Sequence, residues 1–309
     1  MSKVKKGELI FLYDLNWANP NGDPNDANKP RIDGETGLNI VTDVRLKRTI
    51  RDELIQKGYD ILVKDTFDET NGTLKDGKTR AKDFIEEGVN IAKLTVEQTQ
   101  KLHENIKKCI DVRLFGCTLP YEKNSVTYTG PVQFKMGYSM HPVKMEYIKG
   151  TGAFASGEGK DQKTFRQEYV LAYTLINFYG MINPRAAEST NLTEEDVNIM
   201  LDAMWEGTQN LISRTKVGQQ PRLLIKVNYK EDDYYIGGID KLIKFESEKN
   251  GEEIRNVEEG TVIVSKLKEQ ILKNKERIES VYIRKDESVK FDIPFEEELK
   301  NSGITVIEK

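Results

Sequence analysis

The fold is decided by the first sixty-six residues, which fall into four segments: GELIFLYDL (7–15), NPNGDPNDANKPRID (19–33), TDVRLKRTIRDEL (42–54) and YDILVKDT (59–66). The first segment is apolar and β-prone, which predicts a buried strand. In the third, Leu46, Ile50 and Leu54 recur every four residues, which predicts a helix from Asp43 to Lys57 with one buried face. Because YDILVKDT predicts another strand, the order strand, loop, helix, strand indicates an α/β or α+β sheet domain.

The rest of the chain extends this domain. Residues 67–118 are charged and largely helical in pattern, which predicts a helical insertion. Strand patterns resume at 125–139 and 168–182, an amphipathic helix capped by Thr193 follows over 192–214, and 221–229 predicts a central strand. The tail has a strand–helix–strand pattern. No repeat or linker divides residues 1–309, so we expect a single elaborated domain.

Composition excludes some classes of protein. No segment approaches the roughly 18 to 20 apolar residues that cross a bilayer, and the N-terminal residues lack a signal-peptide pattern, so we expect a cytoplasmic protein without a membrane partner. The chain has only two histidines and two cysteines. Cys109 and Cys117 lack the spacing of a zinc site and are expected to be buried. We expect no cofactor.

The net charge of −4 is unevenly distributed. Residues 231–309 hold 20 acidic and 14 basic side chains, so residues 1–230 carry a net charge of +2. Binding of a polyanion depends on a local basic stripe and not on the total charge. The overall charge therefore does not exclude a nucleic-acid partner.

The polar loop 19–33 allows two kinds of site. Carboxylate and amide oxygens suit a metal ion, but neither register of the loop matches a calcium loop, because Pro24 or Ala27 falls where a ligand or glycine is needed. A non-standard metal site that uses Asp23, Asp26 and Asp33 stays open. Asn, Asp, Gly and Pro also form turns without any ligand.

The alternative for this region is a phosphate site at the start of the predicted helix. Thr42 is the expected N-cap, and free N–H groups at a helix N-terminus favour anions. Lys47 and Arg51 lie four residues apart and share one flank of the helix, while Arg45 and Arg48 are expected on the far, exposed side. Lys29 and Arg31 end the loop, so the pattern brings six cations to one place. A solvated basic face would show the same pattern.

Residues 141–166 form a second candidate region. They are glycine-rich and basic at both ends, and are too long for an ordinary hairpin turn. Lys144, Lys163 and Arg166 are interspersed with Met145 and Phe154. Cations for phosphates and aromatic or thioether groups for bases are typical of single-strand binding, although a flexible surface loop would also fit this composition.

Several ordered motifs resemble one family. YDLNWANPNGDPNDANKPRID, GLNI with VTDVRLKRTIRDEL, DVRLFG, GPVQF and GMINPRAAESTNLTEEDV resemble the CRISPR-associated Cas-seven backbone family of the RAMP superfamily, and within it the subtype I-B (DevR-like) branch. The resemblance extends from the first strand to about residue 230 and is weaker in the tail.

The resemblance implies an α+β fold with a ferredoxin-like (RNA-recognition-motif-like) core, a helical insertion at 67–118 and a long thumb hairpin at 141–166. It also implies a non-catalytic subunit of the Cascade surveillance complex. Copies of such a subunit polymerise along the crRNA, bind other Cascade subunits and present the guide for pairing with target DNA in antiviral defence.

The resemblance assigns roles to individual residues. Lys47 and Arg51 are the best candidates for binding guide phosphates, with Arg31, Thr42 and Arg48 beside them. Arg113 of DVRLFG is placed near the sheet surface, and Gln133 comes from GPVQF. In the thumb, Lys144, Lys163 and Arg166 are candidate RNA ligands, and Met145 or Phe154 is the candidate wedge that displaces a base pair.

Two other functions remain open on the sequence alone. Loop aspartates Asp23, Asp26 or Asp33 would serve a metal-dependent ribonuclease, whose test is cleavage that requires a divalent metal. A free-standing single-stranded RNA-binding module would bind as a monomer at any RNA length. The acidic tail is also expected to contact neighbouring copies in a filament.

Overall fold

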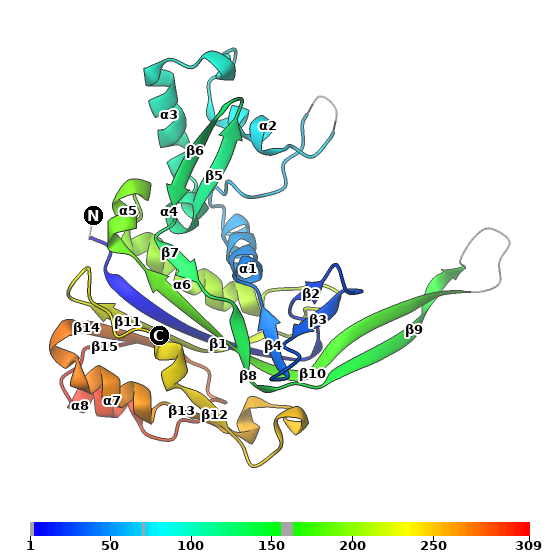
Figure 1. The fold of residues 1–309 in the computed structure, drawn as a ribbon, viewed down its shortest axis with the longest axis vertical. Helices are drawn as coiled ribbons and strands as arrows, with labels where there is room; N and C mark the ends of the chain where they lie inside the picture. The colour runs from blue at the N-terminus through cyan, green and yellow to red at the C-terminus, as the bar shows by residue number, and fades with distance from the viewer. Residues whose placement is uncertain (1–2, 70–71, 156–162) are drawn as a thin grey trace.

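The computed structural model describes residues 3–69, 72–155 and 163–309, with side chains described in these ranges except at 151–166. Its centre is a large, mostly antiparallel sheet with the strand order β15-β14-β11-β1-β10-β8-β4-β3-β2 (Figure 1). β7 (Val132–Phe134) and β9 (Met145–Ala155) also pair with β10. In chain order the strands of the main path are β1 (Lys6–Ala18), β2 (Gly22–Asp23), β3 (Lys29–Ile32), β4 (Leu38–Val41), β8 (Gly137–Pro142), β10 (Lys163–Ile182), β11 (Gln220–Tyr229), β14 (Ile278–Lys285) and β15 (Val306–Glu308).

Helices cover both faces of this sheet. The α-helices are α1 (Asp43–Gln56), α2 (Gly77–Ala81), α3 (Val96–Lys107), α4 (Ile110–Phe115), α5 (Pro184–Thr190), α6 (Glu194–Gln209), α7 (Ser265–Lys273) and α8 (Phe295–Asn301). The 3₁₀ turns are η1 (Lys82–Phe84), η2 (Ile91–Lys93), η3 (Ile239–Leu242), η4 (Gly251–Glu253), η5 (Val257–Glu259) and η6 (Lys275–Arg277). The expected α+β class is confirmed.

The central strand β1 is buried on both faces, as its apolar sequence predicts. Leu9 and Phe11 pack with α1 and α6 on one face, in a core that includes Ile50. Ile10 and Leu12 face the opposite way and pack with residues of the C-terminal segment, which carries α7 and α8. Side chains alternate between the faces of a strand, so a strand covered on both sides carries apolar residues on both of its faces.

The helix predicted at 43–57 is confirmed as α1, with Leu46, Ile50 and Leu54 buried. The helix predicted at 192–214 is confirmed only as far as Gln209. Thr193 caps it in a reciprocal capping box with Asp196. Leu211, which falls within the predicted range, lies beyond the end of the helix and is half-buried.

The strand predicted at 59–66 is wrong. This segment forms no strand, because the Asp111 carboxylate accepts the backbone N–H groups of Leu62 (2.8 Å) and Val63 (3.1 Å). A backbone donor that is bound by a side chain is not available to a sheet ladder. The segment instead links the main domain to the insertion.

A second, smaller core lies above the sheet in Figure 1. It joins α3 and α4 to a separate hairpin of β5 (Gly116–Tyr121) and β6 (Asn124–Thr129). The strand pair expected at 125–139 is therefore corrected: β6 belongs to this hairpin, whereas β7 and β8 join the main sheet. The glycines of DVRLFG and GPVQF meet here, since a Cβ on Gly130 would lie 2.1 Å from the Phe115 carbonyl.

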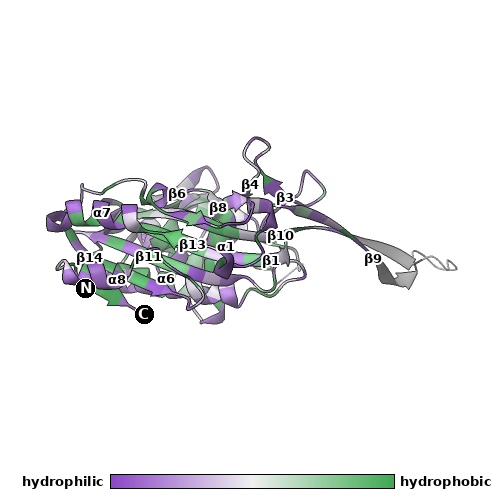
Figure 2. Ribbon diagram, turned by 90° about the horizontal axis from the view of Figure 1, so that it is seen from below, coloured by the Kyte–Doolittle hydropathy of each residue, from purple (hydrophilic) through white to green (hydrophobic). Residues whose placement is uncertain are grey.

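β9 and β10 form a long antiparallel hairpin, with Met145 opposite Leu171 and Gly150 opposite Arg166. Figure 2 shows that this hairpin extends well beyond the body of the molecule. β10 begins at Lys163, earlier than the predicted residue 168, and continues without interruption to Ile182 in the centre of the sheet. The outer hairpin and the strand beside β1 in the main sheet are thus parts of one continuous strand, β10.

The remaining strands form a short two-stranded sheet of β12 (Lys244–Glu246) and β13 (Thr261–Ile263). No helix in the described ranges is long and apolar enough to cross a membrane.

Candidate nucleic-acid interface

The polar loop is fixed to the start of α1. Its backbone forms the short β2–β3 hairpin, in which Asp23 pairs with Lys29. The Asn21 side chain accepts a hydrogen bond from the Thr42 N–H at 2.9 Å, and the Thr42 hydroxyl accepts one from the Arg45 N–H at 3.3 Å. Thr42 is therefore the helix cap, and the loop is held beside the helix N-terminus.

Lys47 points from α1 towards β7. Its ammonium donates to Asp43 at 3.0 Å and to the Gln133 side chain at 3.2 Å, and it lies 5.7 Å from the centre of the Phe115 ring. Gln133 is itself fixed by a 3.0 Å hydrogen bond to the Gly130 carbonyl. Lys47 is thus held in one position by residues from three elements.

Arg51 lies one turn further along the same flank. Its guanidinium donates to Asp111 at 2.9 Å and lies 5.2 Å from the centre of the Phe115 ring. The Arg51 side chain is only 12% exposed, and that of Asp111 is 1% exposed. The pair therefore fastens α4 to α1, and only part of the guanidinium is free to contact a ligand.

These contacts define the α1 site, which consists of Lys47, Arg51 and Gln133 around Phe115. The structure brings these three predicted residues together although they lie on α1 and β7. Because Arg and Lys side chains are natural phosphate ligands and Gln133 offers an amide, the site suits the backbone of a nucleic acid.

Two other predicted cations near the loop, Arg31 and Arg48, are paired with carboxylates. Arg31 donates to Asp23 at 2.7 Å, and its Nε is buried without a hydrogen-bond partner. Arg48 forms a more exposed pair with Asp52 at 2.8 Å.

Arg45 was expected on the exposed side of α1, and that prediction is wrong. Its guanidinium donates to the Thr49 hydroxyl at 2.9 Å. Burial lowers the pKa of this guanidinium, and the exposed residue at this turn is Val44, at 65%. Arg45 therefore supports the fold and does not contribute an exposed cation.

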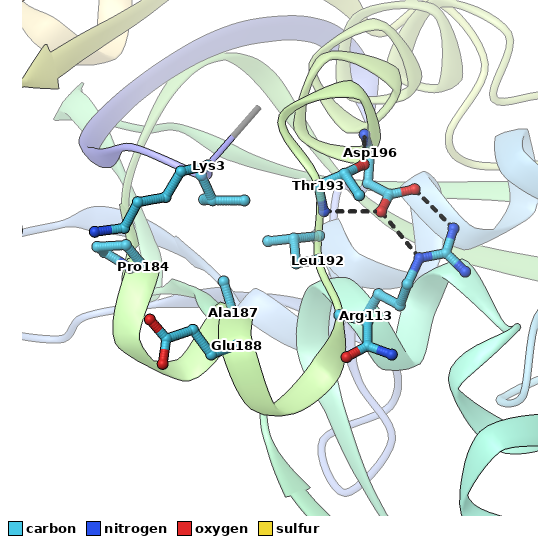
Figure 3. A pocket seen from close by; sticks show the side chains of 10 residues that line it. Lys3, Arg113, Pro184, Ala187, Glu188, Leu192, Thr193 and Asp196 are labelled. Carbon is cyan, nitrogen blue, oxygen red and sulfur yellow. Dashed lines mark hydrogen bonds and ion pairs between the residues drawn. The ribbon is translucent and has the colours of Figure 1, made fainter. Parts of the chain in front are cut away.

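Arg113 does not join the α1 site. It lies on α4 and forms a two-pronged contact with Asp196 of α6, at 2.9 and 2.7 Å. It also donates to the carbonyls of Lys107 and Lys108. Figure 3 shows this contact at the edge of an open pocket of about 690 Å³ that Lys3, Glu188 and Leu192 also line. Arg113 is therefore held at the start of α6 by Asp196, and its place near the sheet surface and at the RNA stays a prediction.

The hairpin residues are described only in part. Lys144 pairs with Glu146 at 2.8 Å, and Met145 is 39% exposed. The side chains of Phe154, Lys163 and Arg166 lie outside the described residues.

Sequence reasoning missed a cluster at the base of this hairpin. Tyr147 and Tyr169 face each other across β9 and β10 with ring centres 5.1 Å apart, and the Lys29 ammonium lies 5.4 Å from the Tyr169 ring centre. The register of two strands brings these rings together, so neither residue alone signals the cluster. Asp111 was also missed, although it stands within the DVRLFG motif.

The loop aspartates have separate partners. Asp23 binds Arg31, Asp26 binds Lys29 at 2.7 Å, and Asp33 accepts a hydrogen bond from the Thr36 hydroxyl at 2.5 Å. The bonds from Thr36 and Glu35 lower the pKa of the Asp33 carboxyl. Within the described ranges, no three His, Cys, Asp or Glu side chains are grouped closely enough to hold a metal ion.

Comparison with known proteins identifies the family. The family model for CRISPR-associated protein Cas7 matches residues 5–265. The CRISPR-associated protein Cas7 of Haloferax volcanii is 33% identical over 313 residues, which cover 95% of this chain and 90% of that protein. A solved chain titled "CRISPR RNA-guided surveillance complex, pre-nicking" has a similar fold, with a TM-score of 0.59 at 12% identity over 98% of this chain and 96% of that chain. The chain therefore belongs to the Cas7 family of CRISPR-associated proteins.

Proposed function

We propose that this chain is the crRNA-binding backbone subunit of a Cascade-type surveillance complex, in the subtype I-B branch. The observation that carries the proposal is the α1 site. Lys47, Arg51 and Gln133 converge around Phe115 beside a loop that is fixed to the helix N-terminus. We infer that the ligand of this site is the guide RNA, because the chain belongs to the Cas7 family.

The strand order supports a ferredoxin-like core for this function. The run β11-β1-β10-β8, with α1 and α6 packed in one core, fits such a core. The β9–β10 hairpin would be the thumb, and residues 67–110 the part of the insertion that faces target DNA. Copies stack along the guide and contact the other Cascade subunits, while base pairing reads the target sequence.

At the α1 site a phosphate would compete with the carboxylates of Asp43 and Asp111 for the two cations, Lys47 and Arg51. Lys47 and Arg51 each contact an aspartate, so their positions are set before RNA arrives and little side-chain entropy is lost on binding. The chain is proposed to have no catalytic role.

The test is a salt-dependent titration of single-stranded RNAs of several lengths, with copy number measured by mass photometry. The variant is Lys47→Ala/Gln133→Ala, which leaves the Arg51–Asp111 pair intact and so avoids a buried unpaired charge. The control is Lys266→Ala on the exposed part of α7. We expect copy number to rise stepwise with RNA length, and the variant to bind roughly tenfold more weakly with a shallower salt slope.

A folded variant that binds like the wild type would refute the role of the α1 site. One copy per RNA at every length would favour a free-standing RNA-binding module. Cleavage that requires a divalent metal would favour the ribonuclease.

A further inference from the structure

The segment of residues 243–260 is held on the main sheet by side-chain packing. Its strand β12 pairs with β13 in a separate two-stranded sheet, and its buried residues Ile254 and Val257 belong to the core on the face of the sheet opposite to α1. A Cβ on Gly251 of η4 would lie 2.6 Å from Cδ of Pro142 at the end of β8, so η4 packs directly on this strand. This segment, named here the β8 cap, can therefore open while the main sheet stays intact.

His141 lies at the contact between β8 and the β8 cap. The residue is buried, with 5% of its surface exposed. Its imidazole stacks on Tyr173 of β10, with ring centres 5.5 Å apart and the planes inclined by 5°, and lies 6.2 Å from the ring centre of Phe245 in β12. The imidazole is therefore part of the packing that holds the cap on the sheet.

The hydrogen bond of His141 determines which nitrogen can take up a proton. Nδ1 lies 2.8 Å from the Pro142 carbonyl oxygen, and because a carbonyl can only accept, Nδ1 carries the hydrogen of the neutral ring. Nε2 is the basic atom that remains, and it is buried without a hydrogen-bond partner in the described part of the chain. Protonation would place a positive charge and a second N–H at this position, which is costly in a buried site.

The titratable and charged groups around the imidazole have other partners or carry positive charge. Tyr173 donates its hydroxyl to Asp14 at 2.9 Å, and Asp14 is paired with Arg222 at 2.9 Å. From the cap, Arg255 is a cation, Glu259 is paired with Lys249 at 2.8 Å, and Glu252 and Glu253 of η4 are exposed to solvent. The neighbours on β4, β8 and β12, which are Asn39, Ser139 and Phe245, carry no charge.

Burial is the main cause that lowers the pKa of His141, and the charge of Arg255 lowers it further. The carbonyl groups of Pro142 and Gly251 act in the opposite direction but do not cancel the effect. The imidazole is thus kept neutral by its position between the sheet and the cap, and separation of the two would remove this constraint.

We propose that His141 is a pH-sensitive latch, which holds the β8 cap on the sheet while the imidazole is neutral and releases the cap when Nε2 is protonated. In the open state the ring is hydrated and regains its ordinary pKa of 6.5. Because the pKa is lower than this in the closed state, the closed state binds fewer protons. The latch is therefore fully effective above about pH 6.5 and weakens as the pH falls below that value.

The carboxyl of Asp14 cannot produce this loss. Burial raises the pKa of that carboxyl, so the closed state binds more protons there as the pH falls, and its contribution has the opposite sign. The latch is additional to the proposed binding of RNA at α1 and does not depend on it.

Hydrogen–deuterium exchange of the full chain measures the opening of the cap. At about pH 5.5 a hydrated imidazole is protonated roughly ten to one, so opening should increase by up to about tenfold between pH 7.5 and pH 5.5. After correction for the intrinsic pH dependence of amide exchange, the amides of residues 244–260 should show this increase, and the amides of α6 should not.

The two histidines of the chain supply the variant and its matched control. His141→Phe keeps a ring that can stack on Tyr173 but cannot bind a proton, so the pH dependence of residues 244–260 should disappear. His103→Gln removes the other imidazole, which lies on α3 of the insertion beside Tyr128, and should leave that pH dependence unchanged.

A second measurement does not require the His141 variant to fold. In the His103→Gln chain, expressed without a histidine tag, the one remaining imidazole signal in an NMR titration belongs to His141. Its midpoint should lie below pH 6.5, and a midpoint at or above that value would overturn the proposal.

Three results of the exchange experiment would also overturn it. They are an unchanged rate in the wild type, a pH dependence that persists in folded His141→Phe, and an equal increase in α6, which would mean that acid opens the whole fold. None of these measurements contains RNA, so the latch and the proposed function can fail independently.

Discussion

The two basic regions of the molecule differ in how their cations are paired. In and around the α1 site, Lys47, Arg48 and Arg51 each contact a carboxylate within 3.0 Å. In the second region, around η3 and β12, Lys241 and Lys244 have no carboxylate partner in the described part of the chain. Under the proposed function the first region would exchange a carboxylate for a phosphate, whereas the second carries charge that no carboxylate neutralises. A cluster of Lys and Arg in a sequence therefore does not show how many of these cations lack a carboxylate partner and can bind a ligand.

The paired region also has a structural role. Asp111 joins Arg51 to the N–H groups of Leu62 and Val63. Through these contacts the buried Asp111 carboxylate holds three segments together, which are α1, α4 and residues 59–66.

The largest expected effect follows from removing that carboxylate. Asp111→Ala leaves Arg51 without its ion-pair partner and two N–H groups without an acceptor, so we expect a loss of about 3–5 kcal/mol in the free energy of unfolding. Chemical denaturation measures it. Asp52→Ala, which breaks the exposed pair with Arg48, is the control and should cost less than about 1 kcal/mol. If the two variants lost similar amounts of unfolding free energy, the expected difference between the buried and the exposed ion pair would be wrong.

The second prediction concerns Arg113, which is paired like Arg51 but away from the α1 site. Asp196→Ala removes the two-pronged contact with Arg113 and half of the α6 capping box. We expect about 2–3 kcal/mol of destabilisation. RNA affinity measured below the melting temperature should stay within twofold of the wild type. If the folded Asp196→Ala variant bound RNA much more weakly than the wild type, Arg113 would instead be assigned to the RNA-binding surface.

The third prediction tests the exchange of carboxylate for phosphate. Asp43→Asn frees Lys47 from its 3.0 Å ion pair and removes a negative charge beside the expected phosphate. RNA affinity should rise about fivefold, which corresponds to roughly 1 kcal/mol, and the salt slope should become steeper. The change also removes a carboxylate from the first turn of α1, so stability should fall by about 0.5 kcal/mol. Unchanged affinity would show that Lys47 does not meet a phosphate.

The smallest expected effect is at Arg48. Its side chain is 39% exposed and its pair with Asp52 lies at the surface, so Arg48→Ala should change stability by less than about 0.5 kcal/mol. RNA affinity should fall less than twofold, compared with about tenfold for Lys47→Ala/Gln133→Ala in the same titration. If Arg48→Ala weakens binding as strongly as that double variant, the guide follows the other flank of α1.

The sequence predicted the elements whose signals are local. The helix α1, its Thr42 cap and its buried stripe depend on residues within four positions of one another, and the apolar alternation of β1 is equally local. The motifs also indicated the family before any coordinates. The strand predicted for residues 59–66 was wrong, because an apolar, β-prone segment does not show that a carboxylate 49 residues away binds its N–H groups.

The sequence by itself thus determined the α+β class, the two long helices, the central strands, the family and the choice of Lys47 and Arg51 as a pair. Tertiary structure alone decided which cations are neutralised, since Asp111 and Asp196 lie sixty and eighty-three residues from the arginines they bind. It also placed Lys241 and Lys244 in one groove, whose lining comes from β8, β10, β12, the segment around η3 and the link between β7 and β8. Helical and strand periodicity act over a few residues, whereas ion pairs and grooves depend on which distant segments the packed core brings together.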